Sequence, residues 1–294
     1  MNRRLFISLL GTCLAAAPAA AQQDMADVQI TAEEIAPGVA VLFGQGGNIG
    51  VSHGEGGTVL IDDQFAPLSA KIEAAVAGLG ANPVHYVINT HWHGDHTGGN
   101  EHFGKAGAHI FAHKNVRKRL SVDQQRGERV IAAAPAAALP VVTYDRGVRL
   151  HLNGDTIEVM FLGGGHTDGD SVVFWREKNV VHMGDLYFKI AGWPYIDTNS
   201  GGNVERLLFS VDSALSLMDD ETKVIPGHGP MSNKAELMAY RNAIGEAVTR
   251  IRALKQSGKT VEEAQAAKPL ESFQRGEGFI GADAFIAAIW DSLD

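Results

Sequence analysis

The sequence of 294 residues predicts an α/β fold in which candidate functional residues gather at strand ends. Short apolar runs alternate with segments of helical periodicity, which is the pattern of a chain that builds sheets covered by helices. Several of these runs end at a histidine or an aspartate, and α/β enzymes build their sites where strand ends converge. With 45% hydrophobic and 20% charged residues, we expect one domain over residues 22–294, helical in its C-terminal part, 231–294.

The first elements are three strand-like segments and a helix. Residues 39–43 and 49–53 flank the glycine-rich stretch GQGGN, and TVLIDD, residues 58–63, forms the third segment. Pro67 begins a helix whose apolar residues fall on one face until Gly80. These elements lead to the stretch richest in metal-binding side chains.

The stretch NTHWHGDHTGGN follows VHYVIN, an expected buried strand at residues 84–89. It contains His91, His93, Asp95 and His96. Residues two apart do not share a helix face, so we expect a loop that leaves the strand. Imidazole and carboxylate groups in an open loop suit zinc.

Three later apolar runs each deliver one candidate ligand at their end. DTIEVMFL precedes His166, NVVHM precedes Asp185 and TKVIP precedes His228. Since strand ends meet at one sheet edge, these three residues are expected near the first four.

Helical periodicity appears in residues 204–218 and dominates after residue 230. Thr260 and Glu263 give the T-x-x-E signature of a helix start, and residues 282–293 form a last apolar helix. The Ala/Pro-rich stretch 131–140 is most simply a surface connection.

The motif H-x-H-x-D-H, followed in order by the three isolated residues, resembles the metallo-β-lactamase-fold hydrolases. The likeness runs from about Val28 to Pro230 and implies a four-layer αβ/βα sandwich with two zinc ions at one edge of the sheets. It implies that one ion is held by His91, His93 and His166, the other by Asp95, His96 and His228, and that Asp185 bridges both. Asp62, after TVLI, would orient a zinc-bound histidine from behind, or else serve as a turn carboxylate.

Two zinc ions make a nucleophilic serine or cysteine unnecessary. They lower the pKa of a shared water from about 15.7 to about 7 and so supply hydroxide at neutral pH. Asp95 would orient this hydroxide and carry its proton, while zinc and a nearby donor stabilise the oxyanion. We expect a metal-dependent hydrolase that opens an activated or cyclic carbonyl group of a small-molecule substrate.

The sequence leaves two substrate classes open, lactams and other carbonyl compounds. The stretches GGGHTDGDSVVFW and GGNVERLLFSVDSAL resemble the zinc β-lactamases, in which Asn203 would donate to the oxyanion; it is equally a good helix N-cap. Lactamases with a cysteine ligand place it where this chain has Asp185. They carry a substrate-binding lysine at the position of Phe188, with Lys189 here one residue later.

An aspartate that bridges two ions instead resembles the metal sites of glyoxalase II-like thioesterases and of lactonases. A β-lactamase proper remains the alternative, with Lys189 and Asn203 as catalytic candidates and Trp193 and Tyr195 as pocket walls. A phosphodiesterase of the same fold and a non-catalytic zinc-binding protein are further alternatives. A net charge of -9, from 34 acidic and 25 basic residues, argues against a nucleic-acid partner, and the oligomeric state stays open.

The N-terminus, MNRRLFISLLGTCLAAAPAAAQQ, predicts an export signal over residues 1–21 and a periplasmic or secreted protein. Its apolar run is too short to span a membrane, and the paired arginines resemble a twin-arginine signal. The only cysteine, Cys13, would leave with the signal. The mature chain would then have neither a disulfide nor a thiolate ligand.

Overall fold

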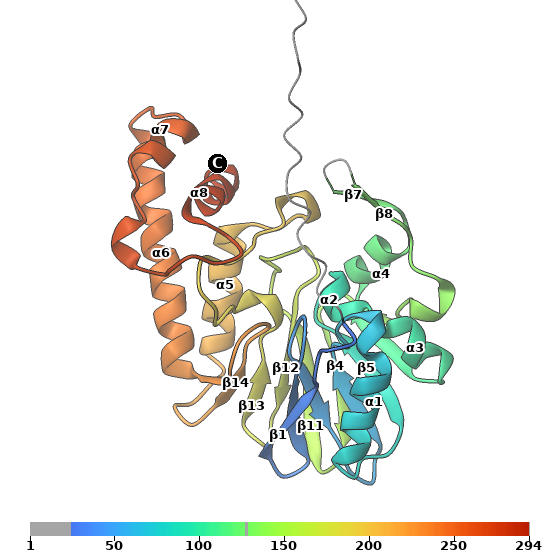
Figure 1. Cartoon of the computed structure of the whole chain (residues 1–294). Coiled ribbons are helices and arrows are strands. Elements are labelled where there is room, and N and C mark those ends of the chain that lie inside the picture. Colours follow the sequence, from blue (N-terminus) through green and yellow to red (C-terminus); the bar gives the residue numbers. More distant parts are fainter. Residues whose placement is uncertain (1–24, 127–128, 294) are drawn as a thin grey trace, which may run out of the picture.

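Two β-sheets lie face to face between outer layers of helices in the computed structural model, which describes residues 25–126 and 129–293 (Figure 1). The expected export signal, residues 1–21, lies outside the described residues. The layer order is helix, sheet, sheet, helix. The predicted αβ/βα sandwich is therefore confirmed.

The first sheet has seven strands in the spatial order β1-β2-β3-β4-β5-β6-β9. Neighbours from β1 to β4 are antiparallel, whereas β4, β5, β6 and β9 run parallel. The strands are β1 Thr31–Ala36, β2 Val39–Phe43, β3 Ile49–Ser52, β4 Thr58–Ile61, β5 Val84–Asn89, β6 His109–His113 and β9 Val142–Tyr144.

The second sheet has six strands in the order β10-β11-β12-β13-β14-β15. Only β13 and β14 are parallel. The strands are β10 Gly147–Leu152, β11 Asp155–Phe161, β12 Ser171–Trp175, β13 Val180–His182, β14 Lys223–Ile225 and β15 Ser232–Asn233. A separate two-stranded sheet pairs β7 Gln124–Arg126 with β8 Arg129–Ile131.

Helices cover the outer face of each sheet (Figure 1). The α-helices are α1 Ser69–Gly78, α2 Gly94–Thr97, α3 Asn100–Lys105, α4 Lys114–Leu120, α5 Val204–Leu215, α6 Lys234–Gln256, α7 Val261–Ala266 and α8 Ala282–Ser292. The short 3₁₀ helices are η1 Ala66–Leu68, η2 Ala136–Ala138, η3 Gly184–Leu186, η4 Thr198–Ser200 and η5 Glu271–Phe273. Of the described residues, no helix is both long enough and apolar enough to cross a membrane.

Three apolar clusters hold the layers together. The inner cluster, with Trp175 at 0% exposure, fills the space between the sheets. A second joins the first sheet to α1 and α3 through residues such as Ile72 and Phe103. A third joins the second sheet to α5, α6 and α8 through residues such as Leu207 and Phe285. The expected C-terminal helices are thus part of the core.

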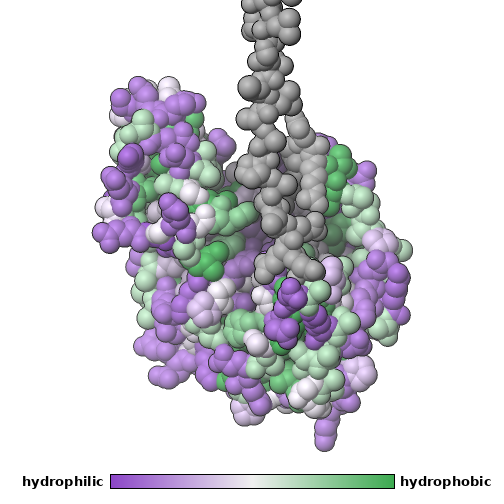
Figure 2. Space-filling model, viewed as in Figure 1, coloured by the Kyte–Doolittle hydropathy of each residue, from purple (hydrophilic) through white to green (hydrophobic). Residues whose placement is uncertain are grey.

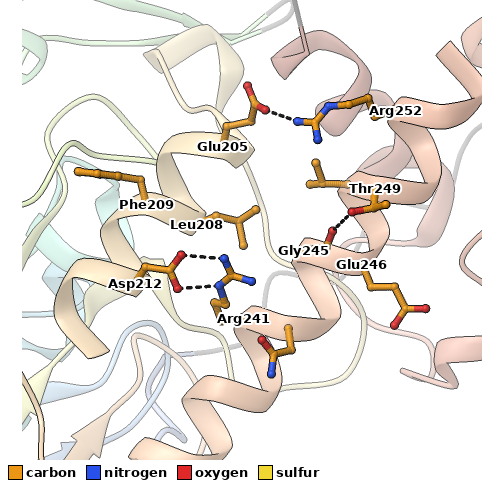
Figure 3. A pocket seen from close by; sticks show the side chains of 11 residues that line it. Glu205, Leu208, Phe209, Asp212, Arg241, Gly245, Glu246, Thr249 and Arg252 are labelled. Atoms are coloured by element: carbon orange, nitrogen blue, oxygen red, sulfur yellow. Dashed lines mark hydrogen bonds and ion pairs between the residues drawn. The ribbon is translucent and has the colours of Figure 1, made fainter. Parts of the chain in front are cut away.

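The C-terminal helices form an amphipathic outer layer. Hydrophilic residues cover much of its outer surface, at the upper left of Figure 2. The Thr260 hydroxyl and the Glu263 side chain form the predicted capping box at the start of α7. Asp212 of α5 pairs with Arg241 of α6, with Oδ1 and Nε 2.6 Å apart (Figure 3).

Two local expectations differ from the structure. The stretch after β5 is not wholly a loop, because Asp95 and His96 lie in the single turn α2. The Thr97 hydroxyl donates to the His93 carbonyl at 3.1 Å and closes this turn. The stretch 131–140 contains η2 and is more than a connection, because it also lines a cavity described below.

Phe285→Ala should lower the free energy of unfolding by about 3–5 kcal/mol, because it empties a packed core position. Phe285 is fully buried and stacks on Trp193, with ring centroids 4.7 Å apart. Urea unfolding measures the loss. Phe209→Ala is the matched control: Phe209 is 65% exposed on α5, so its loss should change stability by no more than about 0.5 kcal/mol. Equal effects of the two substitutions would contradict the packing of α8.

Candidate metal centre

Four chain segments bring all seven predicted ligands to one edge of the two sheets. The first follows β5, the second precedes β12, the third follows β13 and the fourth follows β14. The ligand atoms form two groups: His91, His93, His166 and Asp185 in one, and Asp95, His96 and His228 in the other. Within each group they lie within 4.8 Å of one another.

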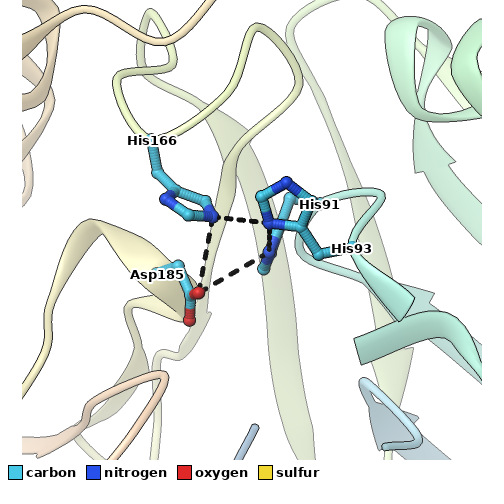
Figure 4. A group of neighbouring side chains, drawn as sticks. All are labelled: His91, His93, His166 and Asp185. Atoms are coloured by element: carbon cyan, nitrogen blue, oxygen red, sulfur yellow. Dashed lines mark hydrogen bonds and ion pairs between the residues drawn. The ribbon is translucent and has the colours of Figure 1, made fainter. Parts of the chain in front are cut away.

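The first group presents three imidazole nitrogens and one carboxylate oxygen to a common point (Figure 4). His93 Nδ1 lies 3.1 Å from His91 Nε2 and 2.8 Å from His166 Nε2. Asp185 Oδ2 lies 3.7 Å from His91 Nε2 and 3.4 Å from His166 Nε2. Ligands about 2.0–2.1 Å from a tetrahedral zinc stand roughly 3.3 Å apart, so the spacing suits such an ion.

The second group lies on the other side of Asp185. His96 Nε2 is 3.3 Å from His228 Nε2 and 3.6 Å from Asp95 Oδ2. Asp185 Oδ1 is 3.2 Å from His96 Nε2 and 3.4 Å from His228 Nε2. One carboxylate therefore faces the first group with one oxygen and the second group with the other.

The buried carboxylate of Asp185 fits a cation held among these atoms. Its side chain is 5% exposed, and Oδ1 is buried without a hydrogen-bond partner among the described residues. A buried carboxylate oxygen without a donor is costly. A divalent cation shared by the surrounding nitrogens would satisfy it.

The outward nitrogen of four histidines is anchored, which points the other nitrogen inward. His93 Nε2 lies 2.8 Å from Asp197 Oδ2, and His96 Nδ1 lies 2.7 Å from Asp62 Oδ2. His166 Nδ1 lies 2.7 Å from the Tyr195 carbonyl.

The fourth anchor is the Thr90 hydroxyl, which donates to Asp62 Oδ2 at 2.7 Å. It can therefore accept from Nδ1 of His91, 3.0 Å away. In neutral rings held this way the inward nitrogens carry lone pairs, and those lone pairs repel one another unless a cation lies between them.

Electrostatics distinguishes the two groups. Burial lowers the pKa of His91 well below its ordinary value and that of His93 to about 4, so both rings are neutral at neutral pH. Burial also opposes charge on His96 and His228, but the carboxylates of Asp185 and Asp95 outweigh it. They raise the pKa of His96 well above its ordinary value and that of His228 to about 9.

Two glycines allow the backbone to pass close to the ligands. A Cβ on Gly47 would lie 2.2 Å from His96 Cε1, and one on Gly227 would lie 2.1 Å from Asp185 Oδ1. Asn48 joins these two segments, because its Nδ2 donates to the carbonyls of Pro226 and Gly229 at 2.9 and 2.8 Å. The hairpin GQGGN thereby fixes the loop that carries His228.

A cavity of about 790 Å³ opens onto both groups. His93, Asp95, Asp185 and His228 form part of its lining. Tyr195 also lines it, as expected, with its ring centroid 5.9 Å from that of His93. The ligands are thus reachable by a small molecule.

The structure does not bring the other candidate residues to this cavity. Lys189 Nζ donates to the Met231 carbonyl at 2.7 Å and pairs with Glu236 at 2.6 Å. Asn203 caps α5, where its Oδ1 accepts from the Arg206 amide at 3.0 Å, so the N-cap interpretation describes its contacts.

Trp193 lies instead in the third core cluster, against Phe285. Each of these three side chains is engaged elsewhere in the fold, and no contact here supports the catalytic or pocket role expected for it. Asp62 does contact a candidate ligand histidine from behind, as expected.

Asp197 is a site residue that the sequence did not reveal. It is 1% exposed, and its Oδ2 accepts from Ser200 Oγ at 2.7 Å as well as lying against His93. It comes from an irregular segment 104 residues after His93. No motif marks it, and only its position in an Asp-x-x-Ser turn hints at a buried carboxylate.

The sequence of the chain identifies its family. The model of the metallo-β-lactamase superfamily matches residues 43–228. The chain belongs to this superfamily. The matched segment runs from the end of β2 to the last candidate ligand.

Three relatives illustrate the range of proteins to which this chain is similar. The probable metallo-hydrolase YqgX of Bacillus subtilis is 28% identical over 162 residues, 54% of this chain and 75% of that protein. The hydroxyacylglutathione hydrolase of a Polaromonas species is 27% identical over 181 residues, 60% of each chain. The type 2 metallo-β-lactamase of Bacteroides fragilis is 24% identical over 142 residues, 48% of this chain and 52% of that protein. The chain is thus placed among metal-dependent hydrolases, as the sequence predicts.

Solved structures share the fold. A metallo-β-lactamase from Pontibacter korlensis has a TM-score of 0.61 at 19% identity, covering 74% of this chain and 99% of that one. The sec-alkylsulfatase Pisa1 from a Pseudomonas species has a TM-score of 0.67 at 17% identity, covering 89% of this chain and 50% of that one. At these identities the likeness concerns the fold alone.

Asp197→Asn and Asp62→Asn should each weaken metal binding by about 10–100-fold, because each removes the carboxylate that orients one histidine. Asp197→Asn should act selectively on the group of His93. Asp62→Asn should act on the group of His96 directly and also on His91, whose anchor Thr90 donates to Asp62. Stepwise cobalt titration, followed by the visible spectrum, measures the two affinities. Each variant is the control for the other, and equal weakening of both steps by both variants would contradict the assigned contacts.

Proposed function

We propose that this protein is an exported dinuclear zinc hydrolase that opens an activated or cyclic carbonyl substrate of the lactone, thioester or β-lactam type. The observation that carries the proposal is Asp185, whose two oxygens face two groups of metal-binding side chains at the base of one cavity. His91, His93 and His166 would hold one ion with Asp185, and Asp95, His96 and His228 the other. Zinc there would supply Lewis acidity and a nucleophile at neutral pH.

Asp95 is the carboxylate that would interact with the attacking water. Its side chain is 28% exposed at the cavity, with Oδ2 3.3 Å from His228 Nε2. Burial raises the pKa of Asp95, but the charges of His96 and His228 outweigh it and hold that pKa at about 2. Asp95 is therefore an anion at neutral pH that can orient the attacking water by accepting a hydrogen bond from it.

Tyr195 and Phe188 position the substrate beside the ligands. The Phe188 ring stacks on His228 with centroids 5.4 Å apart, and the Tyr195 ring lies against His166 at 5.6 Å. Both line the cavity. Their faces confine a carbonyl group near the two metal positions and limit the access of bulk water.

A β-lactamase proper is the second candidate, supported by the relative of that name in Bacteroides fragilis. Lactones and thioesters are favoured over it by the contacts of Lys189. This cation, the nearest in sequence to the position of the substrate-binding lysine in cysteine-type lactamases, pairs with Glu236 instead. The carboxylate of a β-lactam would lack that partner.

Asp185→Asn should reduce kcat/KM by at least about 100-fold, because it removes a charge worth several kcal/mol to both ions. The measurement is hydrolysis of an aryl ester, a lactone, a thioester and a cephalosporin by the zinc-loaded protein, with and without chelator. Asp220→Asn is the control, since Asp220 is 94% exposed at the surface, and it should leave every rate unchanged.

Loss of activity in chelator and its return with zinc would support the proposal. Chelator-resistant hydrolysis would contradict it, as would metal binding without turnover of any substrate. Turnover of the cephalosporin alone would select the β-lactamase candidate.

The proposal of export rests on residues 1–21, which carry paired arginines, an apolar run and small residues before Gln22. The mature domain would then be residues 22–294. Mass spectrometry of the protein from the native cell should find an N-terminus near Gln22 in the periplasmic fraction. An intact Met1 terminus in the cytoplasm would refute export without touching the proposed chemistry.

A further inference from the structure

Two separate parts of the chain contribute apolar side chains to the cavity that contains the candidate ligands. One contributes Leu120 at the end of α4 and Ile131 of β8. The other contributes Ile190 and Phe279. A concave site lined in this way binds ligands through apolar contact, with few polar groups to set their orientation.

Two of these side chains are unusually exposed for their size. Phe279 is 81% exposed and Ile190 is 41% exposed. Removing such side chains from water is favourable. Exposed apolar side chains beside a cavity therefore indicate a surface that a ligand covers. Phe65 also lines the cavity, and both its ring and Asp95 lie close to Gly46, so an apolar side chain lies near a candidate ligand as well.

Phe279 is held in place by its backbone neighbours. The Trp193 amide donates to the Ile280 carbonyl at 3.0 Å, and the Gly192 amide donates to the Arg275 carbonyl at 3.0 Å. The ring itself contacts Tyr195 edge-on, with centroids 6.1 Å apart. The segment of Phe279 is therefore fixed to the loop that lines the cavity, although it follows the family match by some fifty residues.

The charges around the cavity argue against an anionic substituent on the substrate. Among its described lining residues there is no lysine or arginine, whereas Asp95 and Glu101 are carboxylates. Arg275, close to Phe279 in sequence, lies over the rings of Trp193 and Tyr240 at 5.1 and 5.8 Å. Beyond the metal positions, an anionic substituent would find no cationic partner among the described lining residues.

We propose that the site selects carbonyl substrates that carry an uncharged, apolar chain or ring, and that Phe279 is a specificity-determining residue that covers this apolar part. The inference rests on the hydrolase function proposed above and names its substrate class. Phe279 lies in the C-terminal part, beyond the matched segment 43–228, whereas Leu120, Ile131 and Ile190 lie within it.

Three aryl esters with one leaving group test the proposal on the zinc-loaded full chain. They are p-nitrophenyl acetate, p-nitrophenyl octanoate and the mono-p-nitrophenyl ester of octanedioic acid, which has the same length as octanoate but ends in a carboxylate. We expect kcat/KM for octanoate to exceed both others by about tenfold or more, because apolar contact is added and no charge is left unpaired.

Phe279→Ala should lower kcat/KM for octanoate about tenfold and leave acetate within about twofold, since only the long chain reaches the ring. The conservative variant Phe279→Leu should keep most of the kcat/KM for octanoate. Phe209→Ala is the matched control, because Phe209 is a similarly exposed phenylalanine on α5 that lines a different groove, beside α6 (Figure 3). It should change neither rate.

Equal rates for acetate and octanoate, or a preference for the diacid ester, would overturn the substrate inference and leave the hydrolase function standing. Absence of chelator-sensitive hydrolysis of any ester, lactone, thioester or cephalosporin would overturn both. Sedimentation of each variant completes the test: loss of a dimer in Phe279→Ala, without a change in the ester ratio, would assign Phe279 to a contact between copies and overturn the inference.

Discussion

A buried carboxylate between two sets of imidazoles is the constraint on which the rest of the structure depends. Asp185 is 5% exposed and faces one set with each oxygen. A charge in such a place is tolerated only when nearby groups compensate it. The histidines give that compensation through protons or through shared cations, and only cations satisfy the inward lone pairs of His91 and His93, whose rings burial keeps neutral.

The sandwich supplies the rigidity that this arrangement requires. Each ligand segment leaves or enters a strand of the two central sheets, and the apolar cluster around Trp175 locks those sheets together. Behind the ligands, Asp62 and Asp197 fix the orientation of two rings. In front, Gly47 lets the hairpin approach His96 closely. The fold thus holds the candidate ligand atoms of each group close together.

The sequence predicts the layers and the ligands because both rest on short, local patterns. H-x-H-x-D-H and the three later strand ends need only the spacing along the chain. Asp197, Phe279 and the 131–140 wall were missed because their roles arise from contacts between distant segments. Asn203 caps α5, which is one of the two interpretations that its sequence position offers. Lys189 pairs with Glu236, 47 residues away, and no local pattern indicates that contact.

The matched segment 43–228 holds all seven candidate ligands, whereas Phe279 lies beyond it. Anomalous diffraction at the zinc edge, from crystals of the zinc-loaded protein, would show whether two ions share Asp185. We expect two peaks about 3.5–4 Å apart, one on either side of the Asp185 carboxylate. A single peak at full zinc saturation would contradict this expectation.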